Sequence, residues 1–82
     1  MALNDIKTNI QSYLTSIKTN PFNEDVIRNY IYQNIIKPVE VAMNIFTSII
    51  TPSETDTELK VKVLLYYPKN PTPENFIETV TK

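Results

Sequence analysis

The sequence predicts a small, single-domain α+β protein that is rich in helix, with its elements in the order α-α-α-β-α. Three observations predict this class. Apolar residues near the N-terminus recur at the spacing of a helix face, one later stretch alternates as a strand does, and a chain of 82 residues fits one domain over residues 1–82. No internal repeat or shift in composition indicates a second domain.

The first helix is predicted over residues 3–19. Its apolar residues recur every three or four positions, which is the pattern of an amphipathic helix. Asn4 is the expected N-cap. Asn20-Pro21 ends the helix, because a residue before proline avoids the α region.

The second helix is predicted to follow Asn23 and to run to residue 36. Asn23 is a favourable N-cap, and the two acids after it suit the positive end of the helix dipole. Pro38 is expected to end or kink this helix. Tyr30 and Tyr32 fall on different sides of it, so we expect one of them to lie outside the core of a monomer.

Residues 38–51 allow two interpretations. On a helical wheel every apolar residue from 39 to 50 falls on one arc, which predicts a third helix with Pro38 at its first position. The β-branched content favours a strand instead, and residues 39–50 would then form a hairpin with 58–67, giving the order α-α-β-β-α. The helix is preferred because strand alternation leaves three apolar residues on the polar side.

The second half of the chain is predicted to contain one strand and one helix. Residues 51–58 are expected to form an acidic polar loop, and the alternating residues 58–67 a strand. Residues 68–73 form a proline-rich turn, after which Thr72 and Pro73 have the pattern of a helix start. The apolar face of this terminal helix would hold Phe76, Ile77 and Val80.

A single strand needs a partner, because its backbone donors and acceptors are otherwise unpaired. Three partners are possible for residues 58–67. The first is residues 39–50 of the same chain, the second is the same strand of another copy, and the third is an edge strand of a different protein.

The composition excludes several kinds of chemistry. The chain has no cysteine, histidine or glycine. It therefore lacks a catalytic triad that contains histidine, a zinc site of the usual ligands, a disulfide and a glycine-rich phosphate loop. We expect a protein that is not an enzyme and that uses no cofactor or metal. Without glycine, the turns must be built by the six prolines and by asparagine, which tolerates left-handed backbone.

The charge and hydropathy limit the expected partners. The net charge of −1 gives no basic excess that would attract nucleic acid. No stretch has the length of a membrane span, so a soluble protein without membrane insertion is expected. The lack of thiols leaves the compartment unassigned.

Two acidic groups and one basic group are the remaining candidates for sites. On a helix, Glu74 and Glu78 would share a face, but a solvated pair is the more ordinary interpretation. The alternating acids of residues 54–58 lack the glycine and the distal glutamate of a calcium loop. Tyrosines around the strand could stack on bases, and lysines could neutralise phosphates. However, adjacent tyrosines on a strand point to opposite faces and cannot form one platform. The basic group is Lys60, Lys62, Tyr66, Tyr67 and Lys69.

One local pattern resembles a known family. Thr19-Asn20-Pro21-Phe22-Asn23 between two helices resembles the turn of the needle subunits of type III secretion systems. This resemblance covers less than half of the chain, and the strand and the proline-rich tail do not fit a helical hairpin. No family is therefore assigned.

The expected function is a non-enzymatic structural or assembly subunit that acts as a homo-oligomer. The alternative is a small adaptor or inhibitor, of the kind that viruses and mobile elements encode, which binds a larger protein. In either case the interface is expected on the second and third helices and the strand. Its predicted residues are Tyr30, Tyr32, Val39, Met43, Phe46, Leu59, Val61, Val63 and Tyr66.

Overall fold

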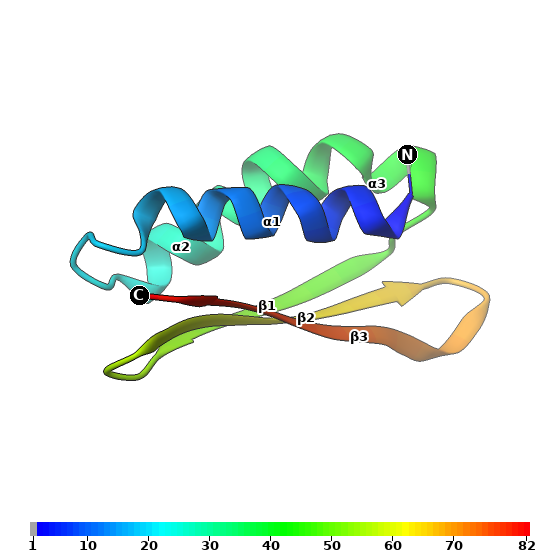
Figure 1. Cartoon of the computed structure of the whole chain (residues 1–82). Helices are drawn as coiled ribbons and strands as arrows, with labels where there is room; N and C mark the ends of the chain where they lie inside the picture. Colours follow the sequence, from blue (N-terminus) through cyan, green and yellow to red (C-terminus); the bar gives the residue numbers. More distant parts are fainter. Residues whose placement is uncertain (1) are drawn as a thin grey trace.

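Two helical segments lie side by side on one face of a three-stranded antiparallel sheet (Figure 1). The computed structural model describes residues 2–82. The helical layer holds α1 (Leu3–Ile17) and a longer segment made of α2 (Glu24–Ile31), η1 (Tyr32–Ile36), η2 (Lys37–Val39) and α3 (Glu40–Met43). The sheet holds β1 (Thr47–Glu54), β2 (Glu58–Tyr67) and β3 (Asn70–Thr81) in that spatial order.

The expected order α-α-α-β-α is wrong, and so is the alternative α-α-β-β-α. All the strands follow the helices. The described chain is 43% helix and 37% strand, so the description as rich in helix is also not supported. β2 is the central strand and pairs with β1 on one side and β3 on the other. Both of its partners therefore lie within the chain.

Residues 38–51 divide at Asn44 instead of forming one helix. Asn44 has the left-handed backbone (φ 56°) expected of asparagine in a chain without glycine, and it ends α3. The β-branched residues that follow form β1, which extends through Glu54 into the segment predicted as a loop. A tight turn makes this extension possible, because the Thr55 N–H donates to the Glu58 carbonyl at 2.8 Å.

The predicted terminal helix is an edge strand, β3. Phe76 and Val80 are buried, while Ile77 is 57% exposed, which is the two-residue period of a strand. The Thr72-Pro73 start signal was misleading, because pairing along β2 outweighs local propensity in this segment. Prolines are tolerated in β3 because it lies at the edge of the sheet.

The first helix and the N-cap of the second are confirmed. α1 spans Leu3–Ile17, although Ala2 and not Asn4 is its N-cap. The Asn23 side chain accepts a hydrogen bond from the Val26 N–H at 3.1 Å. The second helical segment passes Pro38 without ending, because the chain loosens into a π-helix before the proline and tightens into a 3₁₀ turn around it.

The core lies between the helical layer and the sheet. The odd-numbered residues of β2 from Leu59 to Leu65 point toward the helices, where their side chains are almost fully buried, and Tyr67 is partly buried against the same core. α1 lies over β3, and α2 lies over β1. The buried apolar residues are Ile6, Ile10, Leu14, Ile27, Ile31, Ile35, Ile36, Val39, Ile45, Ile50, Leu59, Val61, Val63, Leu65, Phe76 and Val80.

Candidate functional site: an uncovered sheet face and two apolar ends

The sheet has one face that no described element covers, which we call the open sheet face (Figure 1). Strand alternation places the odd-numbered residues of β1 and β3 and the even-numbered residues of β2 on this face. A single sheet layer therefore separates the core from the surroundings. This arrangement is common in antiparallel sheets, whose outer face is usually polar.

The open sheet face is not uniformly polar. Ile49 and Ile77 are 49% and 57% exposed, and Leu64 is half-buried between their strands. Leu64 is opposite Ile49, and Ile77 is opposite Lys62, two residues from Leu64 along β2, so Ile77 and Leu64 are diagonal neighbours. The three side chains form a diagonal apolar stripe across all three strands, and half-buried Tyr66 follows Leu64 on the same face.

The charges on the open sheet face are few and partly balanced. Lys60 pairs with Glu58 at 3.6 Å, and both side chains are substantially exposed. Lys62 lies between Thr51 and Ile77 in the register. By alternation Tyr66 is on the open face and Tyr67 on the helix side, so they do not form one aromatic platform. Lys69 lies in the turn before β3.

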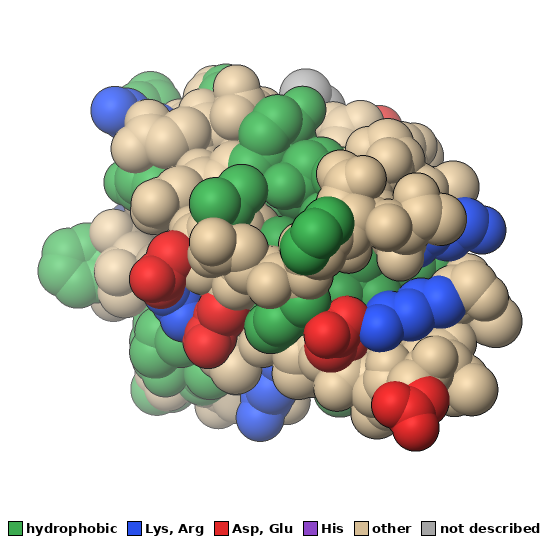
Figure 2. Space-filling model, turned by 90° about the vertical axis from the view of Figure 1, so that its left-hand side faces the viewer, with side chains coloured by type: hydrophobic (Ala, Val, Ile, Leu, Met, Phe, Trp, Pro, Cys, Tyr) green, Lys and Arg blue, Asp and Glu red, His purple; other side chains and the backbone are tan. Residues whose placement is uncertain are grey.

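A small apolar pocket lies at the end of the molecule where α1 turns into α2. Its cavity volume is about 70 Å³. Figure 2 faces this end and shows hydrophobic side chains gathered among the helices, with acidic and basic side chains below them. The apolar lining consists of Tyr13, Ile17, Pro21, Phe22, Val26, Ile27 and Leu59, and the polar lining of Lys18, Asn20, Asn23 and Glu54.

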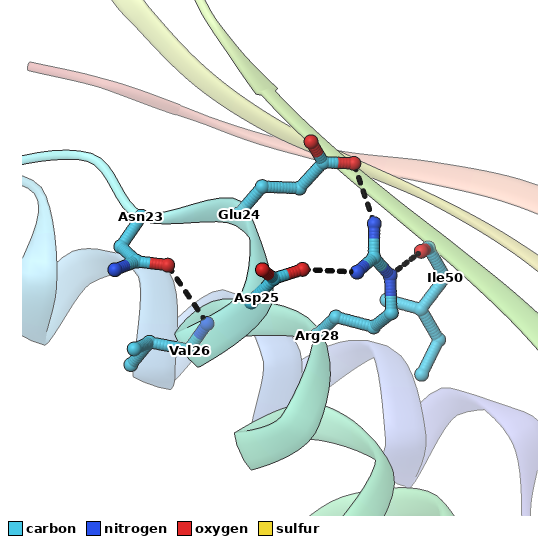
Figure 3. Close-up of polar contacts among 6 residues, drawn as sticks. All are labelled: Asn23, Glu24, Asp25, Val26, Arg28 and Ile50. Atoms are coloured by element: carbon cyan, nitrogen blue, oxygen red, sulfur yellow. Dashed lines mark hydrogen bonds and ion pairs between the residues drawn. The ribbon is translucent and has the colours of Figure 1, made fainter.

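Arg28 links α2, which contributes Val26 and Ile27 to the pocket lining, to strand β1 (Figure 3). Its guanidinium donates to the backbone carbonyl of Ile50 at 3.1 Å and to the Asp25 carboxylate at 2.7 Å, and it also pairs with Glu24. In an antiparallel pair every second residue directs its backbone N–H and C=O toward the partner strand. Thr55 bonds to Glu58 across the pair, so the odd-numbered residues of β1 face β2 and the Ile50 carbonyl points away from it. Arg28 thus covers the outer edge of β1.

Gln11 covers the opposite edge of the sheet, as Arg28 covers the edge of β1. Its side-chain amide donates to the Thr79 carbonyl of β3 at 3.1 Å. Lys7, on the same helix, lies over the Phe76 ring at 5.3 Å. Each helical segment therefore places one hydrogen-bond donor on one edge of the sheet, which reduces the number of free carbonyls available to an added strand.

Two apolar side chains are strongly exposed at the other end of the molecule. Val41 is 95% exposed on α3, and Phe46 is 73% exposed just before β1. The Phe46 N–H donates to the Tyr66 carbonyl at 2.7 Å, which holds the backbone of this residue against the sheet. We call these two residues the apolar knob.

The predicted interface residues are divided between the core and the surface. Leu59, Val61 and Val63 lie in the core, because they occupy the helix-facing side of β2, and Val39 is also buried. Tyr32 and Met43 are half-buried, and the Tyr32 hydroxyl lies 3.4 Å from the Glu40 carboxylate. Tyr66 is half-buried as well, and the exposed members are Tyr30 and Phe46.

The predicted site residues omitted Ile49 and Ile77. The sequence pattern places both on predicted helices, each within an apolar arc. The β-branched content of residues 45–51 was the one signal that favoured a strand there.

Tyrosines 13 and 30 join the two helical segments. Their rings stack with centroids 3.9 Å apart and an interplanar angle of 9°. Burial raises the pKa of the Tyr13 hydroxyl above its usual value, and the neighbouring Tyr30 raises it further. Burial also raises the pKa of Tyr67, with a smaller contribution from the Glu74 carboxylate.

The acidic residues do not assemble into a group with the composition of a metal site within residues 2–82. Glu74 and Glu78 are on a strand and not on a helix, so about 13 Å of backbone separates them. Glu54 pairs with Lys82, and Glu58 with Lys60. No group of three or more potential metal-ligating side chains occurs in the described part of the chain. No helix over the same residues is long and apolar enough to cross a membrane.

Comparison of the chain with protein-family models, curated proteins and solved structures gives no significant match. The fold and the surfaces described above are therefore the basis for a functional proposal.

Proposed function

We propose that this protein is a non-enzymatic structural or assembly subunit that self-associates through its open sheet face. The observation that supports the proposal is the apolar stripe of Ile49, Leu64 and Ile77 on a face that no described element covers. Exposed apolar side chains are ordinary when scattered, but a contiguous group on a flat face is typical of an interaction surface.

A second copy is the occupant that best fits this face. Two sheets pack face to face about 10 Å apart when their facing side chains are apolar or small. The stripe is surrounded by threonine hydroxyls, by Asn75 and by the exposed Lys62. Lys60 is already paired with Glu58, so within the described residues Lys62 is the one cation on this face that two approaching copies must direct toward solvent. In a twofold dimer each stripe would contact the other stripe.

The size of the chain gives a second reason. A domain of this length buries only about 60% of the surface of its unfolded chain, and small domains commonly gain stability from oligomerisation. The chain has no disulfide to supply that stability. Covering the open sheet face would extend the core to the other side of the sheet.

The test is the molar mass by light scattering over a dilution series from millimolar to low micromolar. Ile77→Glu places a charge in the stripe, where the folded monomer exposes the side chain, so the variant is expected to fold and to lose the dimer. Gln33→Glu, an exposed change on the helical layer, is the matched control and should keep the wild-type mass. A monomeric wild-type chain throughout the series would contradict the proposal and favour a small adaptor or inhibitor that binds a larger protein.

A further inference from the structure

The pocket beside the α1–α2 turn has room for part of one apolar side chain. Cavities of about 150 Å³ bind benzene, so the 70 Å³ available here suit an aliphatic side chain or the edge of an aromatic ring. The pocket lining is mainly aromatic and aliphatic, and it includes the charged side chains of Lys18 and Glu54. The interaction of Arg28 with Glu24, Asp25 and Ile50 holds the wall that Val26 belongs to.

The apolar knob is a matching group of the same chain. Phe46 and Val41 flank the Asn44 turn, and both are far more exposed than is usual for large apolar residues. The backbone of Phe46 is held by its hydrogen bond to Tyr66, so only the rotamers of the side chain remain to be ordered on binding. An exposed phenylalanine on a fixed backbone has the properties of an interface anchor.

The knob and the pocket lie at opposite ends of an elongated molecule. The chain measures 39 × 21 × 21 Å, and Figure 1 shows the α1–α2 turn at one end of the long axis and α3 with the start of β1 at the other. One chain cannot place Phe46 in its own pocket. A second copy, shifted along the long axis, brings its knob to the pocket of the first.

The turns at the two ends carry opposite charges. Asp56 lies in the β1–β2 turn at the pocket end, and Lys69 lies in the β2–β3 turn at the knob end. Neither residue belongs to an ion pair within residues 2–82. A shift along the long axis brings these two turns of successive copies toward each other, so the charges favour this arrangement.

We propose that the chain also associates head to tail, with Phe46 and Val41 of one copy packed against the pocket of the next. Such a contact joins two different surfaces, so it continues from copy to copy and builds a filament, or a ring if the rotation between copies closes. This contact does not depend on the open sheet face. If both contacts form, the molecule becomes a subunit of an extended assembly.

The test uses the Ile77→Glu chain, in which the open sheet face is disabled, and measures molar mass by sedimentation over the same dilution series. This chain is expected to form species that grow with concentration. Adding Phe46→Ser removes the aromatic side chain of the apolar knob, and adding Val26→Glu places a negative charge at the entrance of the pocket. Each addition should weaken association at least about tenfold, because the apolar contact between Phe46 and the pocket is lost. Both residues are exposed in the folded monomer, and circular dichroism checks that the variants fold.

Mixing the two variants gives the decisive result. The Phe46→Ser chain keeps an intact pocket, and the Val26→Glu chain keeps an intact knob, so an equimolar mixture should form a dimer that neither variant forms alone. A mixture that stays monomeric would overturn the head-to-tail proposal, as would an Ile77→Glu chain that is monomeric at every concentration. By contrast, an Ile77→Glu chain with the dimerisation of the wild type would contradict the proposed use of the open sheet face.

Discussion

Replacing Arg28 by alanine is expected to destabilise the fold by about 2 kcal/mol. The two ion pairs with Glu24 and Asp25 involve exposed side chains and are worth about 0.2–0.5 kcal/mol each. The partly buried hydrogen bond to the Ile50 carbonyl, made by a charged donor, adds roughly 1–2 kcal/mol. For a domain of this size, about 2 kcal/mol lowers Tm by roughly 8–16 °C and the urea midpoint by about 1–2 M.

The assay is urea unfolding followed by circular dichroism, at low salt and in 1 M sodium chloride. High salt screens the ion pairs but leaves the carbonyl bond, so about half of the destabilisation or more should persist. Lys37→Ala removes the same charge from an exposed position of the helical layer and should change stability by less than about 0.5 kcal/mol. An Arg28→Ala loss that disappears completely in high salt would refute the role assigned to the Ile50 carbonyl.

Two further predictions concern the Asn44 turn and the tyrosine pair. Asn44→Ala should lower the free energy of unfolding by about 1 kcal/mol, because alanine is disfavoured in left-handed backbone, whereas Asn44→Gly should be neutral or stabilising. Thermal unfolding compares the two variants, and equal losses of stability would contradict this reasoning. The fold favours the neutral form of Tyr13, so its stabilising contribution is complete below about pH 10 and is lost as the pH rises through the raised pKa. Urea midpoints should therefore fall above about pH 10, less steeply for Tyr13→Phe, and identical slopes would argue against this coupling.

The local elements could be predicted because their signals lie within a few residues. The apolar spacing of α1 and the side-chain cap of Asn23 depend on contacts three or four positions apart, and both occur as the sequence predicts. The alternation of β2 was also sufficient to identify a strand with one buried face. These features follow from backbone geometry and the period of the side chains.

The candidate surfaces could be predicted only in part. Phe46 and Tyr66 were identified as interface candidates from their size and position, and both have accessible surface. The open-face residues Ile49 and Ile77 were not, because each was placed on the apolar face of a helix. Whether a side chain is exposed depends on the helix or strand that contains it, and for these two residues the predicted helix is a strand.

Four features can be predicted from the residues alone: α1, the start of α2, the strand β2 and the use of asparagine at a left-handed turn. Tertiary contacts are needed to establish that residues 47–54 and 70–81 are strands, that Pro38 lies within a continuous helical segment, and that one sheet face is left uncovered. The physical reason is that strand pairing joins residues distant in the chain. β2 offers hydrogen bonds along both sides, and pairing with it stabilises segments whose local patterns also fit a helix.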